Sequence, residues 1–346
     1  MTATNVSLDP TQRAHWTSDQ DVRWCPGCGD YGILAAMQFF HGELAAEPGS
    51  TVTRENTVFI SGIGCAARFP YYMSTYGMHS IHGRAPAIAT GLAIARPDLN
   101  IWVVGGDGDM LSIGGNHLIH ALRRNVNLKI LLFNNQIYGL TKGQASPTSE
   151  VGKVTKSTPM GSIDRPFSPL SLAAGAGATF IARTHDLDRK HMIETFRRAN
   201  AHNGSSLVEI YQNCNVFNDG AFDQITKRSA RTNMFIDLVD GQPIRFGADG
   251  EFGVMLNNGT ASVVNVDDVG IDSIAVHNES DPSPTVAFAL SELAKDRQSP
   301  TVFGVLRAVD VAEYSQSIND QVVAANAAKG PGDLSELLRS GATWEV

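Results

Sequence analysis

The stretch that decides the expected fold is residues 101–109, IWVVGGDGD, together with residues 129–135, KILLFNN. In both, a short apolar run ends in a polar turn rich in glycine or asparagine. Continuous apolar runs of this length are typical of strands covered on both faces, as in parallel sheets. Three further runs have the same character, at residues 57–61 (TVFIS), 179–182 (TFIA) and 206–211 (SLVEIY).

Segments with helical spacing of their apolar residues lie between these runs, at residues 31–44, 85–95 and 113–124. Alternating strand and helix signals predict an α/β fold, a doubly wound and mostly parallel sheet. Ligands of such sheets bind beyond the carboxyl ends of the strands. The turns at residues 62–65, 105–109 and 134–135 are expected at those ends.

Composition argues against a nucleic-acid-binding protein and against a membrane-spanning one. The chain has 346 residues, 42% of them hydrophobic, and its formal charge is 27 − 35 = −8. The acidic balance and the absence of a long Lys/Arg run argue against a nucleic-acid partner. No run of 18 apolar residues is present, so we expect no membrane span. The polar N-terminus resembles neither a secretory signal nor a transit peptide, and we expect a cytoplasmic protein.

An acidic turn and an amide pair are expected side by side. Asp107 follows the apolar run 101–104, Asn135 follows the run 129–133, and 25 residues separate Gly108 from Asn134. Carboxylate, amide and carbonyl oxygens suit Mg²⁺, which takes its remaining ligands from phosphates. Gly106 and Gly108 would let a diphosphate approach the backbone. The alternative is two ordinary turns, since Gly-Asp-Gly and Asn-Asn both form turns.

The four cysteines form a second candidate site. Cys25 and Cys28 make a C-x-x-C pair, Cys65 follows the run 57–61, and Cys214 lies three residues after the run 206–211. If those two runs are neighbouring parallel strands, Cys65 and Cys214 emerge at one edge, where all four thiols could bind one metal centre. Thiolates select zinc or iron–sulfur clusters. The alternative is that Cys65 and Cys214 are small buried apolar residues.

Beyond Lys227 the pattern of long strands and helices ends, and turn signals separate short strand candidates. A polar tail follows the apolar run at residues 301–306. We therefore divide the chain into an N-terminal arm (residues 1–23), a main domain (24–226) and a C-terminal extension (227–346). The extension is expected to pack on another surface.

Five motifs, taken together, resemble one family. They are WCPGCGD (residues 24–30), GIGC (62–65), IHGRA (81–85), GDGD (106–109) and YGLTKGQ (138–144). In this order they are similar to the β subunits of the two-subunit 2-oxoacid:ferredoxin oxidoreductases, from about Trp24 to Asp219. The Gly-Asp-Gly and Asn-Asn pair alone resembles the signature of thiamine-diphosphate enzymes.

The resemblance implies a thiamine-diphosphate-binding fold with one 4Fe–4S cluster held by Cys25, Cys28, Cys65 and Cys214. It also implies Mg²⁺ bound by Asp107, Asn135 and the carbonyl of Ile137. A partner α subunit would supply the glutamate that activates the thiamine. The residues that would line the cofactor are Ile63, Gly64, Cys65, His82, Gly106, Asp107, Gly108, Asp109, Asn135, Gly139, Leu140 and Thr141.

The implied reaction is the oxidative decarboxylation of a 2-oxoacid, with coenzyme A taking the acyl group and ferredoxin the electrons. Arg68 could pair with the distal carboxylate of a dicarboxylic substrate, and His82 could reach the diphosphate. Arg68, the long match around residues 139–148 and the resemblance to the two-subunit type favour 2-oxoglutarate. The alternatives are a pyruvate-specific relative or a non-catalytic subunit stapled by zinc.

Overall fold

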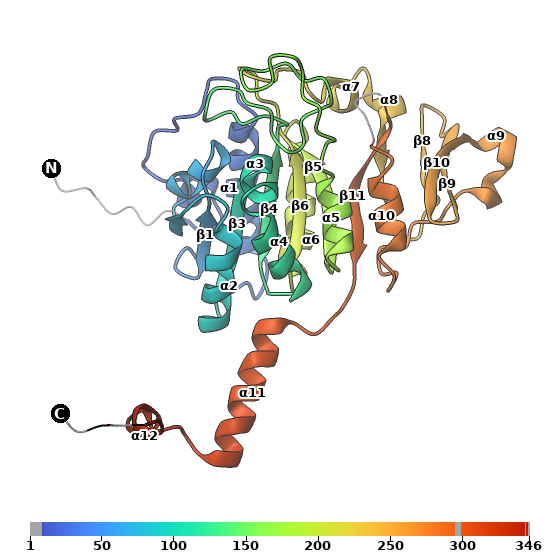
Figure 1. Ribbon diagram of the computed structural model, residues 1–346. Coiled ribbons are helices and arrows are strands. Elements are labelled where there is room, and N and C mark those ends of the chain that lie inside the picture. The colour runs from blue at the N-terminus through green and yellow to red at the C-terminus, as the bar shows by residue number, and fades with distance from the viewer. Residues whose placement is uncertain (1–8, 295–298, 343, 345–346) are drawn as a thin grey trace.

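A sheet of eight strands runs through the centre of the chain in the computed structural model, which describes residues 9–294, 299–342 and 344 (Figure 1). The strand order is β2-β1-β3-β4-β6-β5-β11-β7, and all neighbours are parallel except β11 and β5. The strands are β1 (Thr57–Ser61), β2 (Tyr76–His79), β3 (Asn100–Gly106), β4 (Lys129–Asn134), β5 (Phe180–His185), β6 (Ser206–Tyr211), β7 (Phe235–Asp237) and β11 (Thr301–Ala308).

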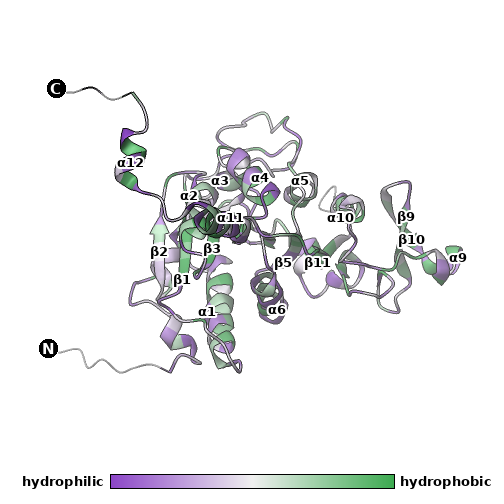
Figure 2. Ribbon diagram, turned by 90° about the horizontal axis from the view of Figure 1, so that it is seen from below, coloured by the Kyte–Doolittle hydropathy of each residue, from purple (hydrophilic) through white to green (hydrophobic). Residues whose placement is uncertain are grey.

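Helices cover both faces of this sheet (Figure 2). One layer holds α1 (Asp30–Ala46) and α6 (Arg189–Ala201), and the other holds α2 (Ala85–Ala95), α4 (Gly115–Arg123), α5 (Pro169–Gly175) and α10 (Thr285–Ser291). Successive strand residues alternate between the two buried clusters, because side chains of a strand point to opposite faces. Ile101 and Val103 join one cluster, and Trp102 and Val104 join the other. Burial on both faces explains why the strands read as continuous apolar runs.

The five strand predictions and three helix predictions are confirmed. The runs at residues 57–61 and 206–211 have the predicted bounds as β1 and β6, and residues 85–95 form α2. The other elements differ from prediction by a few residues at their ends. The mostly parallel α/β sheet is therefore as the sequence predicts.

The C-terminal extension is organised differently from the expectation. Strands β7 and β11, which come from it, complete the main sheet, so the sheet crosses the boundary that we placed at residues 226–227. Three further strands form a separate antiparallel sheet, β8 (Arg245–Phe246), β9 (Phe252–Asn257) and β10 (Thr260–Asn265). These strands and the helices after β11 lie outside the main sheet and its helical layers.

The polar tail is largely helical. Helix α11 (Tyr314–Lys329) begins at Glu313, whose carboxylate accepts hydrogen bonds from the amides of Ser315 and Gln316. It points away from the body and leads to α12 (Leu334–Arg339) (Figure 1). Its packing on another subunit stays a prediction.

The remaining elements are short turns of helix that connect the strands. They are η1 (Arg13–Trp16), η2 (Ala66–Tyr72), α3 (Asp107–Leu111), α7 (Asp223–Thr226), α8 (Arg231–Met234), α9 (Val266–Val269) and η3 (Ile271–Ser273). Within the described residues, none of the helices has both the length and the apolar character that a membrane crossing requires.

Candidate active site

The carboxyl ends of β1, β3, β4 and β6 meet at one edge of the sheet. Strands β3 and β4 are parallel neighbours, and Gly106 pairs with Phe133 in their register. Asp107 and Asn134 therefore follow at the same level, as the spacing of the two motifs predicts. Strand β6 lies on the other side of β4, with Asn134 opposite Tyr211.

Asp107 is buried, and hydroxyl groups hold one of its carboxylate oxygens. Ser146 Oγ and Thr148 Oγ1 each lie 2.5 Å from Asp107 Oδ2. Burial raises the pKa of the Asp107 carboxyl to about 6, although both hydroxyl groups oppose the rise. In the part of the chain that the structure describes, no cationic side chain pairs with Asp107, and a buried carboxylate of this kind is one that a divalent cation stabilises.

Asn135 is held on both sides of its side-chain amide. Its Nδ2 donates to Gln212 Oε1 at 2.8 Å, and its Oδ1 accepts the amide of Ile137 at 3.2 Å. The carbonyl of Asn135 also accepts a hydrogen bond from Asn218 Nδ2 at 2.8 Å. The turn that carries the two further predicted Mg²⁺ ligands is therefore fixed by the loop after β6.

Asp109 joins two loops at the mouth of the site. Its Oδ1 accepts hydrogen bonds from the amides of Ile63 and Gly83, at 3.1 and 2.8 Å, and from His82 Nδ1. Because Nδ1 of His82 is bonded to this carboxylate, Nε2 is the ring nitrogen left for a ligand. The side chain of His82 is 40% exposed, so a ligand can reach it.

Gly108 meets the YGLTKGQ loop closely. A Cβ atom at Gly108 would lie 2.1 Å from the ring of Tyr138, whose hydroxyl group donates to the carbonyl of Gly108 at 3.1 Å. Only glycine allows this approach. The loop that would cover the cofactor is thereby packed directly against the acidic turn.

The thiols gather beside this loop. A Cβ atom at Gly139 would lie 3.4 Å from Cys65 Sγ and 3.8 Å from Cys214 Sγ. Cys28 accepts a hydrogen bond from Gln212 Nε2 at 3.2 Å. All four cysteines are free thiols, with Cys25 exposed and Cys214 buried.

The strands that precede Cys65 and Cys214 were expected to be neighbours, and they are not. Strands β1 and β6 are not neighbours, because β3 and β4 lie between them. Cys65 and Cys214 still emerge at the same edge, and the segment around Cys214 turns back towards the C-x-x-C pair. Asn215 Nδ2 donates to the carbonyl of Pro26 at 2.7 Å, and the amide of Gly29 donates to the carbonyl of Asn213 at 3.1 Å.

Burial shapes the electrostatics around the thiols. It raises the pKa of the Cys65 thiol to about 12 and that of Cys28 far above its ordinary value, and the Asp30 carboxylate adds to both shifts. Burial likewise raises the pKa of Asp30 to about 7 and of Asp186 to about 6. Thiolates at this position therefore need a positive partner, such as bound metal, to be stable.

Arg68 lies on the 3₁₀ helix η2, directly after Cys65. Its Nη1 is 3.5 Å from the carbonyl of Arg23, and its charge lowers the pKa of the Cys65 thiol, against the larger effect of burial. Arg68, the predicted substrate contact, is therefore half-buried and lies between the thiols and the cofactor loops.

Several residues of the site were not among those predicted from the sequence. Ser146 and Thr148 hold Asp107 from a loop 39 and 41 residues further along the chain, and Gln212 contacts both Asn135 and Cys28. Hydroxyl and amide side chains in loops are common, so only the folded chain shows which ones face the site. The one signal in the sequence is the hydroxyl-rich run Ser146-Pro147-Thr148-Ser149, which begins two residues after the end of the YGLTKGQ motif.

The donor atoms fit the implied groups. Asp107, Asn135 and the Ile137 carbonyl offer the hard oxygen set that Mg²⁺ prefers, and four free thiols suit an iron–sulfur cluster. Among the described residues, no group of three or more His, Cys, Asp or Glu side chains is arranged to hold a metal ion. A 4Fe–4S cluster spreads its thiolates over separate irons, so its ligands gather less closely than those of a single ion.

Comparisons with known proteins identify the family of the chain. Residues 62–210 match the family described as "Thiamine pyrophosphate enzyme, C-terminal TPP binding domain". The chain is 57% identical over 339 residues to the 2-oxoglutarate oxidoreductase subunit KorB of Mycobacterium tuberculosis, covering 97% of this chain and 89% of that protein.

A more distant relative and a solved structure extend the likeness. The β subunit of 2-oxoacid:ferredoxin oxidoreductase 1 from Aeropyrum pernix is 45% identical over 196 residues, 57% of this chain and 60% of that protein. The solved 2-oxoglutarate:ferredoxin oxidoreductase from Magnetococcus marinus, with 2-oxoglutarate, coenzyme A and succinyl-CoA bound, is similar with a TM-score of 0.73. It is 30% identical in sequence, and the match covers 96% of each chain.

Proposed function

Because this chain belongs to the family of 2-oxoacid:ferredoxin oxidoreductase β subunits, we propose that it converts 2-oxoglutarate and coenzyme A to succinyl-CoA and CO₂ together with an α subunit. The two electrons released pass singly to ferredoxin, and the reaction can run in reverse when reduced ferredoxin is in excess. The observation that carries the proposal is that Asp107 and Asn135 follow neighbouring strands at the sheet edge where Cys65 and Cys214 also lie together beside Gly139. A cytoplasmic location remains part of the proposal.

Thiamine diphosphate bound here supplies the carbon nucleophile and electron sink for decarboxylation, and an adjacent 4Fe–4S cluster accepts electrons one at a time. Asp107, Asn135 and the Ile137 carbonyl hold the Mg²⁺ that binds the diphosphate. Asp109 keeps the loops of Ile63 and His82 in position through its Oδ1. Cys25, Cys28, Cys65 and Cys214 bind the cluster.

The remaining predicted site residues surround the cofactor. Gly64, Gly106, Gly108, Gly139, Leu140 and Thr141 line it, and His82 contacts the diphosphate through Nε2. Arg68 binds the distal carboxylate of 2-oxoglutarate, which pyruvate lacks. The α subunit covers the open side of the site and contributes to the thiamine pocket.

The test is ferredoxin reduction by the chain purified without oxygen together with its α subunit. We expect reduction that requires both 2-oxoglutarate and coenzyme A, with pyruvate a poorer substrate. Preference for pyruvate would replace the substrate assignment. A complex that binds neither thiamine diphosphate nor iron would leave the zinc-stapled, non-catalytic alternative.

A further inference from the structure

A buried ion pair lies inside the central sheet, away from the atoms used above. Arg183 on β5 and Glu209 on β6 are partners in the strand register, and Arg183 Nε lies 2.7 Å from Glu209 Oε2. Their side chains are 2% and 1% exposed. Arg183 also donates to the carbonyl of Val302 at 3.2 Å and lies 4.9 Å from the centre of the Tyr211 ring.

Stability alone does not explain this pair. Removing two charges from water costs about as much as their attraction returns, and apolar residues of the same size often stabilise a core equally well or better. A buried pair is better explained by what its geometry fixes. The neighbours of Glu209 show what that is.

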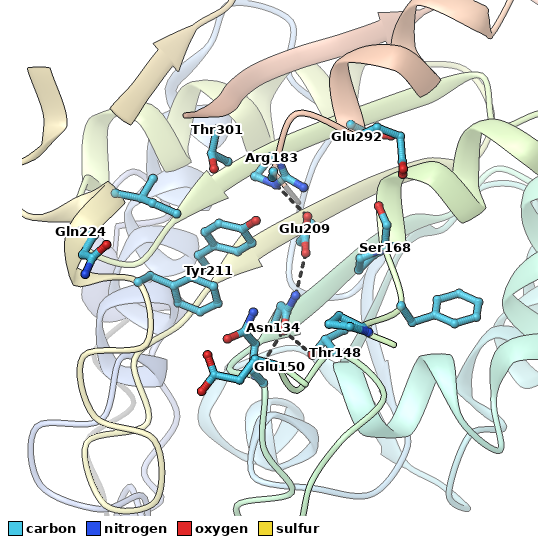
Figure 3. A pocket seen from close by; sticks show the side chains of 18 of the residues that line it. Asn134, Thr148, Glu150, Ser168, Arg183, Glu209, Tyr211, Gln224, Glu292 and Thr301 are labelled. Atoms are coloured by element: carbon cyan, nitrogen blue, oxygen red, sulfur yellow. Dashed lines mark hydrogen bonds and ion pairs between the residues drawn. The ribbon is translucent and has the colours of Figure 1, made fainter. Parts of the chain in front are cut away.

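Glu209 fixes the orientation of the Asn134 amide. Its Oε1 accepts a hydrogen bond from Asn134 Nδ2 at 2.7 Å (Figure 3). A carboxylate that is paired with an arginine accepts hydrogen bonds and donates none, so Asn134 presents its NH₂ group to Glu209. The oxygen Oδ1 of Asn134 therefore points the other way.

That oxygen contacts a neighbour of each half of the proposed Mg²⁺ site. Asn134 Oδ1 accepts the amide of Gln136 at 3.2 Å, within the turn that carries Asn135 and the Ile137 carbonyl. It also lies 2.9 Å from Thr148 Oγ1 (Figure 3). The same hydroxyl oxygen is 2.5 Å from Asp107 Oδ2, and its single proton is donated to one of these two oxygens at a time. A flipped amide would set a donor against the Gln136 amide.

We propose that Arg183 and Glu209 are positioning residues for the cation site, acting through the fixed amide of Asn134 on Asp107 and on the Asn135–Ile137 turn. One cavity of about 770 Å³ is lined by all four side chains of this network, Arg183, Glu209, Asn134 and Thr148 (Figure 3). This inference rests on the proposed function, because it takes Asp107 and Asn135 as Mg²⁺ ligands.

The test compares two double variants that each lack both charges. Arg183→Met with Glu209→Gln keeps an oxygen that can accept from Asn134, whereas Arg183→Met with Glu209→Leu does not. Each is purified with the α subunit and stripped of metal with a chelator. The dissociation constant of Mg²⁺ is then measured by titration calorimetry at saturating thiamine diphosphate. Thermal unfolding shows whether both variants are folded.

Loss of an outer-shell partner typically weakens metal affinity by 10–100-fold, so we expect a loss of about tenfold or more with leucine and less than about twofold with glutamine. Equal Mg²⁺ affinity in the two folded variants would overturn the inference. Failure of the wild-type complex to bind Mg²⁺ and thiamine diphosphate would instead overturn the proposed function.

If neither double variant folds, a substitution of Thr148 is used instead to remove the contact between Asn134 and Asp107. Thr148→Val removes the hydroxyl group between Asn134 and Asp107 with little change in shape, and Thr148→Ser retains it. We expect weaker Mg²⁺ binding with valine and wild-type binding with serine. Equal affinity of these two variants would contradict the proposed network.

Discussion

Two groups of side chains share the carboxyl edge of the sheet, and they differ in how their polar atoms are bonded. Around Asp107 and Asn135, hydroxyl and amide groups hold the oxygens that would bind a cation. Around Cys65 and Cys214, the two thiols both lie beside Gly139, and burial disfavours the ionised form of Cys65. Under the proposed function, the oxygen site would be formed by the protein itself, whereas the thiol site would need its metal to become a defined centre.

The substitution Cys214→Ser is expected to have the largest effect, and to affect the thiol site without affecting the oxygen site. Losing one thiolate should remove nearly all the iron from the complex, because the site has few other groups to hold a cluster. Iron and sulfide analysis of protein purified without oxygen measures this. Mg²⁺ affinity at saturating thiamine diphosphate should stay at the wild-type value, and a full iron complement in the variant would show that Cys214 is not a ligand.

The reverse effect is expected from Asp107→Asn, which removes one charge at the oxygen site. Since outer-shell changes cost about 10–100-fold in metal affinity, loss of a ligand charge should weaken Mg²⁺ binding by more than about 100-fold. Titration calorimetry measures the affinity. Iron content should be unchanged, and a joint loss of iron and Mg²⁺ would mean that the two sites do not form independently.

Arg68 lies at the border of the two sites and should affect substrate choice alone. Arg68→Met should lower kcat/KM for 2-oxoglutarate about tenfold, since a hydrogen bond to a charged group contributes about 1.5–3 kcal/mol. Activity with pyruvate should not fall, because pyruvate has no distal carboxylate. An equal loss with both substrates would assign Arg68 a structural role beside Cys65.

The last prediction concerns the helical layer that supports both sites, and its effect is on stability rather than on either site. His41 on α1 is fully buried, and burial lowers its pKa to about 4. The unfolded chain takes up this proton near pH 6.5, so the stability that depends on a neutral His41 is present above that pH. It is lost as the pH falls towards 4, by about 3 kcal/mol at 1.36 kcal/mol for each pKa unit.

His41→Leu should therefore flatten the loss of stability between pH 6.5 and 4, as measured by urea unfolding across that range. His79→Leu is the matched control, since this histidine is exposed on β2 and its removal should leave the acid limb as in the wild type. An unchanged slope for His41→Leu would mean that His41 becomes protonated in the folded chain. Buried carboxylates contribute to both proteins equally and cancel in the difference.

The sequence predicts the part of the fold that carries the motifs. Strands buried on both faces are recognisable as apolar runs, and a motif that follows such a run must lie at the carboxyl edge. This reasoning places Asp107 beside Asn134 on neighbouring strands, as the structure shows. It also brings Cys65 and Cys214 to one edge, although two strands separate β1 from β6.

Long-range pairing is what the sequence does not show. Strand β11 joins β5 in antiparallel fashion, far along the chain from its partner, and no local pattern specifies that choice. Glu209 and Arg183 stand in strands that read as mostly apolar, and each is explained only by the other and by Asn134. The polar tail becomes helix α11 because helix propensity and the Glu313 cap suffice without a buried face.

The most direct test of the account is the metal content of the complex purified without oxygen, measured as iron, sulfide and zinc per chain with a visible spectrum. The account predicts about four irons and four sulfides per chain and a broad visible absorption, as for a 4Fe–4S centre. A colourless protein with about one zinc per chain would contradict it and support the stapled, non-catalytic alternative.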